Sequence, residues 1–111
     1  MKVINLIYPA TDAAVNVTSV AMDLGDLSNF SVGVDFTGST LAGTLTLESS
    51  NDNSDFVTVA NSSQSVTSAA SHLWSVQGAG YRYVRVKWVA GSGTGNMTAK
   101  LVAKENVVKG A

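Results

Sequence analysis

His72 is the only histidine in the chain and the only side chain suited to act as a general base. Its neighbour Ser71 would be the nucleophile of a serine–histidine pair. Adjacent residues of a β-strand point to opposite faces, so the two side chains could not meet in a hydrogen bond there. We therefore expect His72 to be a structural residue, exposed or partly packed, and we expect the chain not to be an enzyme.

The segment NDNSD, residues 51–55, looks like the start of a calcium-binding loop. The EF-hand pattern requires Asp first, Gly sixth and Glu twelfth, but Asn51, Phe56 and Ser62 occupy those positions here. An Asx-rich turn between two strands is therefore the expected structure. A cation site formed by Asp52, Asp55 and loop carbonyl groups is the alternative.

The glycine-rich segment GSGTG, residues 91–95, lacks the lysine and the following helix of a phosphate-binding loop, so it predicts a turn. The chain also has no cysteine, which excludes a disulfide framework, a thiolate nucleophile, a zinc finger and an iron–sulfur cluster. No nucleophile, base and oxyanion-binding group occur together in the sequence. We therefore expect no cofactor, no catalytic residue and no metal ligand.

The surface of this protein must carry few charges. Charged residues make up 14% of the 111 residues and the net charge is −1, whereas the chain holds 14 Ser and 10 Thr. About a quarter of the residues are charged in an ordinary globular protein. A weakly charged, hydroxyl-rich surface repels other copies little, which favours assembly. The N-terminal MKVINLIYP is too short and too polar for a signal peptide, and no apolar run could span a membrane, so we expect synthesis in a cytoplasm and no membrane partner.

Apolar and polar residues alternate along most of the chain, and no helical period is sustained. The runs over 31–36, 44–48, 81–88 and 97–104 are clear, those over 2–8, 15–17, 56–59 and 73–76 are shorter, and turn residues separate them. The sequence predicts an all-β fold in one domain, residues 1–111: an antiparallel β-sandwich or jelly-roll-like barrel of about eight strands. Residues 1–9 would be an N-terminal arm or edge strand, and residues 105–111 a tail. The expected core residues are Val32, Val34, Phe36, Leu45, Leu47, Phe56, Trp74, Val84, Val86, Trp88 and Leu101.

The strand YRYVRVKW, residues 81–88, has an apolar face and a polar face. The polar face carries Tyr83, Arg85 and Lys87. The glycine-rich segment would join this strand to the run over 97–104 as a hairpin, which places Lys100 and Lys104 on the same outward face. These five residues form the predicted interaction surface.

Charges of opposite sign are segregated along the chain. All but one of the basic residues lie from Arg82 onward, and all but one of the acidic residues lie at or before Asp55. A neighbouring strand could set Asp35 or Glu48 opposite the basic side chains within one molecule. The basic strands of one copy could instead contact the acidic half of the next copy. A nucleic-acid groove is the third explanation, but seven Lys and Arg in a chain of net charge −1 give too little positive potential, so we expect no nucleic-acid partner.

Several motifs together resemble a group of small virion structural proteins of bacteriophages. They are GTLTLESSND at 43–52, LW at 73–74, GYRYVRV at 80–86 and GSGTGNMTAKL at 91–101, with DL at 23–24 and FSV at 30–32. Phe56 stands where a tryptophan is commoner in the group. The resemblance implies a non-enzymatic capsid-decorating, head-fibre or tail-accessory protein located in the virion. Its implied partners are copies of the chain in a symmetric homo-oligomer, for which we expect a trimer, and the major capsid or other virion proteins.

A weaker likeness links SND at 50–52 and RYVRV at 82–86 to discoidin-type carbohydrate-binding domains. Under this alternative the chain would be a carbohydrate-binding module that helps a particle adhere to its host. Tyr8, Tyr81 and Tyr83 would then provide the aromatic surface on which a glycan stacks.

Overall fold

The computed structural model describes residues 3–25, 27, 29–38, 41–67, 71–77 and 79–104. These residues form ten β-strands, and they contain no helix that could cross a membrane. The predicted C-terminal tail, residues 105–111, lies outside the described residues. The strands are β1 (Val3–Asp12), β2 (Val17–Thr18), β3 (Met22–Asp23), β4 (Asn29–Thr37), β5 (Ala42–Ser50), β6 (Val57–Thr58), β7 (Gln64–Val66), β8 (Ser71–Val76), β9 (Tyr83–Ser92) and β10 (Asn96–Lys104).

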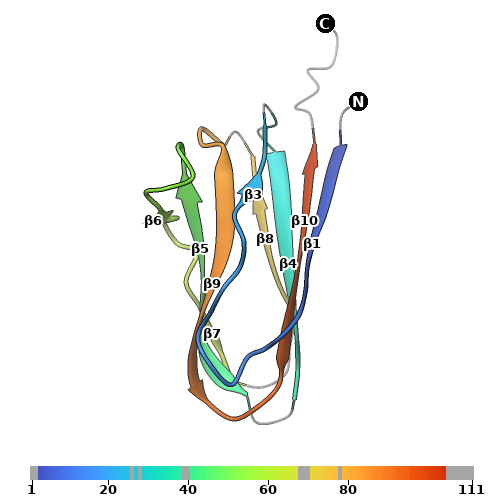
Figure 1. Cartoon of the computed structure of the whole chain (residues 1–111), viewed down its shortest axis with the longest axis vertical. Coiled ribbons are helices and arrows are strands. Elements are labelled where there is room, and N and C mark those ends of the chain that lie inside the picture. The colour runs from blue at the N-terminus through green and yellow to red at the C-terminus, as the bar shows by residue number, and fades with distance from the viewer. Residues whose placement is uncertain are drawn as a thin grey trace, which may run out of the picture.

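Two antiparallel sheets pack face to face in an elongated body with extents of 50 × 27 × 23 Å (Figure 1). Sheet A has the order β1-β10-β4-β8, and sheet B has the order β2-β9-β5-β6, with β3 also pairing with β9 and β7 with β5. The predicted all-β sandwich is therefore confirmed. The strand number exceeds the predicted eight because β2, β3, β6 and β7 have only two or three residues each, too few to show an alternating pattern.

The core lies between the sheets and consists of the inward side chains of alternating strands. Of the eleven predicted core residues, ten are buried, and most of these are fully enclosed. Phe56 is the exception, because it is only partly buried. It precedes β6 by one residue and lies against the outer side of sheet B, where its ring faces the guanidinium of Arg85.

Two buried tryptophans each donate a hydrogen bond to a connecting segment across the sandwich from their own strand. Trp88 of β9 donates its indole N–H to the carbonyl of Ala13, just after β1, at 2.8 Å. Trp74 of β8 donates to the carbonyl of Ser62, between β6 and β7, at 2.9 Å. Each buried indole therefore satisfies its polar group with the backbone of a connection, which ties the two sheets together along both sides.

Strands β9 and β10 do not form the predicted hairpin. β9 pairs with β5 in sheet B, whereas β10 lies between β1 and β4 in sheet A, so residues 93–95 cross from one sheet to the other. Gly95 permits this crossing, because a Cβ there would overlap the carbonyl oxygen of Thr37. Its own carbonyl accepts a hydrogen bond from the N–H of Ala13 at 2.8 Å.

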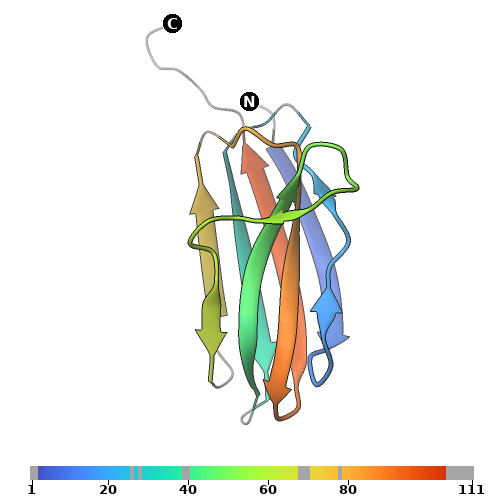
Figure 2. The same cartoon turned by 90° about the vertical axis from the view of Figure 1, so that its left-hand side faces the viewer.

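The strand β1 lies at the edge of sheet A and pairs with β10 of its own chain. Its residues Val3 to Tyr8 are in regular register, and the pairing shifts at the following Pro9, which cannot donate a ladder hydrogen bond. Strand β8 is the opposite edge of the same sheet. Figure 2 shows these two edge strands on opposite sides of the sandwich.

Candidate interaction surfaces

The five residues of the predicted interaction surface lie on two opposite faces of the sandwich. Tyr83, Arg85 and Lys87 of β9 point outward from sheet B. Lys100 and Lys104 of β10 are exposed on the outer side of sheet A. The prediction of one shared face is wrong, because β9 and β10 belong to different sheets. A role for these side chains in contacts between subunits stays a prediction.

Arg85 is held within its own molecule. Its Nε donates to Oε1 of Glu48 at 2.7 Å, in agreement with the register that sets these two residues opposite each other on β9 and β5. The guanidinium carbon also lies 3.9 Å from the centroid of the Phe56 ring. The carboxylate side chain is only 9% exposed and the arginine 30%, so the pair is largely shielded from solvent. The cross-strand explanation of the charge pattern therefore holds for this pair.

A second ion pair lies just before the start of β9. Arg82 contacts both carboxylate oxygens of Asp23 at 2.9 and 3.0 Å, and its guanidinium lies 5.3 Å from the ring centroid of Tyr83. The hydrogen bond from Arg82 lowers the pKa of Asp23, and the N–H of Gly25 lowers it further. About half of each charged side chain is exposed, so this pair positions the start of β9 more than it stabilises the fold.

Three lysines remain as free charges on the described surface. Lys87, Lys100 and Lys104 are exposed, and no ion pair joins them to an acidic side chain within the part of the chain that the structure describes. Asp35, which could have balanced Lys100, instead accepts a hydrogen bond from the hydroxyl of Ser71 at 2.6 Å. Among the described residues, the lysines without an ion pair are therefore one on sheet B, Lys87, and two on sheet A, Lys100 and Lys104.

The segment 50–55 is a self-contained Asx-rich turn. Oδ1 of Asp52 accepts hydrogen bonds from the N–H groups of Ser54 and Asp55 at 2.9 Å and from the hydroxyl of Ser50 at 2.8 Å. Asn53 adopts a left-handed conformation with φ of 61°, which asparagine tolerates better than most residues. The N–H of Asp55 contributes most to the lowered pKa of Asp52. Within the described residues, no three acidic or histidine side chains are placed to share a metal ion.

His72 is partly buried and contacts the core side of the sandwich. Its Nδ1 lies 2.5 Å from Oε1 of Gln64, and its ring meets the ring of Phe36 edge-on at 6.2 Å. Its Nε2 is buried with no hydrogen-bond partner in the described residues. Ser71 faces the other side of β8, toward Asp35. The two side chains point apart, as the sequence predicts.

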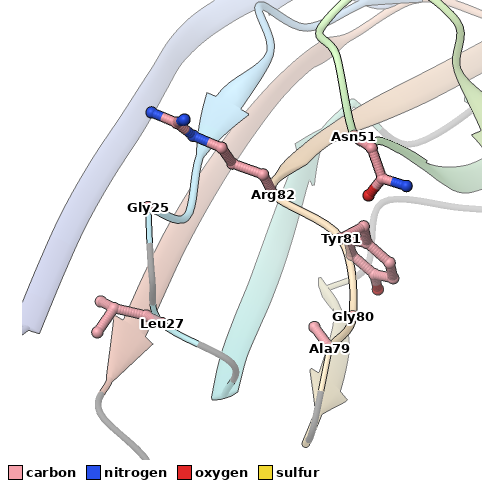
Figure 3. Close-up of a pocket in the computed structure, with 7 residues that line it drawn as sticks. All are labelled: Gly25, Leu27, Asn51, Ala79, Gly80, Tyr81 and Arg82. Atoms are coloured by element: carbon pink, nitrogen blue, oxygen red, sulfur yellow. The ribbon is translucent and has the colours of Figure 1, made fainter.

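A shallow hollow of about 280 Å³ lies where the loops before β4, after β5 and before β9 meet (Figure 3). Its lining includes Asn51, Tyr81 and Arg82, and Figure 3 shows the amide of Asn51 directed toward Tyr81 while Arg82 extends toward β3. The hydroxyl of Tyr81 is buried without a hydrogen-bond partner among the described residues, and burial raises its pKa. Its ring packs edge-on against Phe30 at 6.0 Å.

The three tyrosines proposed for glycan stacking do not form a platform. Tyr8 packs its side chain against the core from β1, and Tyr81 does so beside the hollow. Tyr83 is partly buried beneath Arg82. No one of the three offers a fully exposed ring face.

Two exposed apolar residues of sheet A escaped the sequence prediction. Ile7 of β1 and Leu73 of β8 are 68% and 67% exposed. The alternation of Leu73-Trp74-Ser75-Val76 contains the signal, because a buried tryptophan requires its neighbour Leu73 to point outward. For Ile7 the signal is weaker, since Ile4, Leu6 and Ile7 give no strict alternation.

No protein-family model matches the chain, and no curated protein matches its sequence. Solved structures share its fold, among them the following two. The PBSX exported protein XepA superposes with a TM-score of 0.72 at 18% identity, over 97% of this chain and 39% of XepA. The SPBc2 prophage-derived protein YomS superposes with a TM-score of 0.61 at 15% identity, over 91% of this chain and 93% of YomS. Both are phage-derived proteins. The chain thus spans less than half the length of XepA and nearly all of YomS, and the likeness establishes the sandwich fold.

Proposed function

We propose that this chain is a non-enzymatic structural protein of a bacteriophage particle, in a capsid-decorating or other accessory role. The observation that carries the proposal is the likeness of its whole sandwich to two phage-derived proteins, over 97% and 91% of its length. The protein assembles with copies of itself and with other virion proteins through the outer surfaces of its two sheets.

The sequence motifs that resemble those of phage virion proteins support the same conclusion. GTLTLESSND forms β5 and the start of the Asx-rich turn, and GYRYVRV leads into and begins β9, its partner in sheet B. Most of these residues form the paired strands β5 and β9 of sheet B, and only the motif ends, Asn51 and Gly80 to Arg82, line the hollow. The motifs specify a stable scaffold, which is what a particle component displayed in many copies requires.

The polar groups described above also favour a structural role. Arg85 and Arg82 are occupied by internal ion pairs, Asp52 by backbone N–H groups, and His72 by Gln64. A catalytic site needs a nucleophile, a base and a charge-stabilising group directed at one point, and these side chains are directed at one another instead.

The test is whether the chain is a stoichiometric component of particles. Particles produced by the bacterium that encodes the gene would be purified on a density gradient and analysed by quantitative mass spectrometry and immunogold microscopy. We expect the chain in a fixed ratio to the major capsid protein, and a single rotationally symmetric multimer, a trimer, in sedimentation of the isolated protein. Particles that are complete without the chain would contradict the proposal.

Carbohydrate binding is a second candidate function, favoured by the hollow beside Tyr81. Its polar lining and its position at the loop end of the sandwich suit a sugar, although about 280 Å³ is small beside the roughly 300–1,000 Å³ of typical ligand pockets. Asn51→Ala should abolish a signal on a glycan array, and the matched variant Asn96→Ala, at the other end of the molecule, should not. An array that is blank for the unmodified protein excludes this function.

A further inference from the structure

One row of side chains crosses the outer face of sheet A from edge to edge. The registers of the three strand pairs place Ile7 beside Lys100, Lys100 beside Gly33, and Gly33 beside Leu73. The row therefore begins and ends with an apolar side chain, each about two-thirds exposed, at the two outermost strands. Gly33 leaves the middle of the row low, and a Cβ there would meet the δ-carbon of Leu73 at 3.6 Å.

The inner sides of the same two edge strands carry apolar side chains that are incompletely covered. Ile4, Leu6 and Tyr8 of β1 and Val76 of β8 pack against the core while remaining partly exposed. The apolar core therefore extends to both edge strands of sheet A, and no charged side chain within Val3 to Tyr8 or within β8 separates it from solvent there.

Both edges also lack the usual protection against pairing. Isolated edge strands in stable monomers commonly carry charges or prolines that prevent another strand from adding. The regular part of β1, VINLIY, and the whole of β8, SHLWSV, contain no Lys, Arg, Asp or Glu and no proline. Pro9 interrupts β1 only beyond this segment.

The strand directions suit the joining of these two edges. Sheet A has four strands that are antiparallel throughout, so β1 and β8 run in opposite directions. A second copy in the same orientation would present its β1 antiparallel to β8 of the first, so that the ladder continues. Val3 to Tyr8 and Ser71 to Val76 have six residues each, and equal lengths leave few backbone groups unpaired.

We propose that copies of this chain join head to tail through sheet A, with β8 of one copy paired antiparallel to β1 of the next. Leu73 of one copy lies opposite Ile7 of its neighbour, and the shared row becomes continuous across the contact. Such a contact uses a different patch on each partner and closes into a ring when the rotation between copies allows it. The inference rests on the proposed function and deepens it, because it assigns the contact between copies to the two edge strands of sheet A, at the margins of that sheet's outer face.

Cysteine cross-linking tests this contact directly, because the natural chain has no cysteine. Opposite side chains of an antiparallel pair have Cβ atoms roughly 4.5–5.5 Å apart, within reach of a disulfide or a short bismaleimide. The double variant Ile7→Cys with Leu73→Cys should give a ladder of covalent multimers on a denaturing gel. Each single variant should stay monomeric there, and so should the matched double variant Ile7→Cys with Val57→Cys, whose second cysteine is equally exposed on sheet B.

Other outcomes would overturn the contact. A covalent dimer from Ile7→Cys alone would show that two β1 edges meet symmetrically, and a wholly monomeric double variant would show that the edges do not meet. A charge at the contact gives an independent readout that does not depend on disulfide geometry. Leu73→Lys should eliminate the multimer in sedimentation while the far-UV circular dichroism spectrum shows that the β-fold is retained, whereas Val57→Lys should keep the multimer. Retention of the multimer by Leu73→Lys would contradict the inference.

The two proposals fail in distinguishable ways. If the chain is found in particles and the unmodified protein is multimeric, but no head-to-tail ladder forms, the edge contact is wrong and the particle role stands. If complete particles lack the chain, the particle role is wrong whatever the cross-linking shows.

Discussion

Ser19 and Ser62 lie at the two ends of one line of cross-strand neighbours in sheet B, and each accepts a backbone hydrogen bond there. The line contains Val86 of β9 and Leu47 of β5, which are partners in the register. The hydroxyl of Ser19 accepts the N–H of Val86 at 2.9 Å, and the hydroxyl of Ser62 accepts the N–H of Leu47 at 3.2 Å. Both serines are buried. Ser19 lies between the short strands β2 and β3, and Ser62 lies between β6 and β7. At these breaks, each serine hydroxyl takes the place of the backbone carbonyl that a continuous neighbouring strand would offer.

Replacing either serine by alanine should destabilise the sandwich by about 1–3 kcal/mol, because a buried backbone N–H loses its acceptor. The free energy of unfolding would be measured by chemical denaturation. Three strand spacings separate the serines by about 14 Å, so the two losses should add in the double variant. The exposed Ser65→Ala is the control and should change stability by less than about 0.5 kcal/mol. A Ser62→Ala variant as stable as this control would show that the hydroxyl is dispensable.

Arg85 and Lys87 lie on the same face of β9 and should nevertheless respond differently to charge reversal. Arg85→Glu sets a second carboxylate beside the shielded Glu48 and removes the cation over Phe56, so we expect a loss of about 2–4 kcal/mol and a lower Tm. Lys87→Glu replaces an exposed charge opposite Thr46 and should leave the Tm unchanged. Calorimetry of the two variants makes the comparison. Equal Tm values would mean that the Arg85 pair contributes no stability.

The sequence predicted the sandwich well because apolar and polar residues alternate along each long strand, and this alternation shows which side chains point inward and which point outward. Val84 and Val86 are buried and Lys87 is exposed, as alternation requires. Alternation does not record which strand lies beside which. β10 belongs to sheet A because it pairs with β1 and β4, which are far from it in sequence. The prediction of one shared face for the five surface residues is therefore wrong.

Phe56 illustrates a second limit. Its run Phe56-Val57-Thr58-Val59 is apolar enough to predict a strand with a buried face, but β6 contains only two residues and Phe56 precedes it. The ring covers the ion pair of Arg85 instead of entering the core. The pairing of Glu48 with the basic strand could be anticipated from charge, whereas the aromatic cover over it depends on the path of the Asx-rich turn.

The Asx-rich turn should make stability depend on pH in the acid range. The N–H of Asp55, the hydroxyl of Ser50 and the N–H of Ser54 hold the pKa of Asp52 below its usual value near 3.8. A lowered pKa in the folded state means that the stabilisation is complete above the unfolded pKa and is lost as the pH falls through the folded pKa. Stability should therefore decrease as the pH falls below about 4.

The variant Asp52→Asn should show a flatter dependence of unfolding free energy on pH over that range, measured by denaturation at a series of pH values. Asp55→Asn removes the same charge from the same turn while keeping the N–H that Asp52 accepts, and it serves as the control. Parallel pH profiles for the Asp52→Asn variant and the unmodified protein would show that the turn does not favour the ionised carboxylate.

Gly43 is a position on β5 at which a single added methyl group should be damaging. It lies on β5 opposite Ala90, and a Cβ there would be 2.5 Å from the Cη2 atom of Trp88 and would overlap the carbonyl of Val89. The indole cannot move aside freely, because its N–H is bonded to Ala13 and its ring packs against Phe36 at 4.8 Å. Gly43→Ala should therefore cost about 1–3 kcal/mol of stability or more, through overpacking. Gly80→Ala is the matched control, since an added Cβ there meets nothing within 4 Å. Unfolding curves in denaturant should separate the two variants clearly, and a Gly43→Ala variant as stable as Gly80→Ala would mean that sheet B and Trp88 shift together to make room.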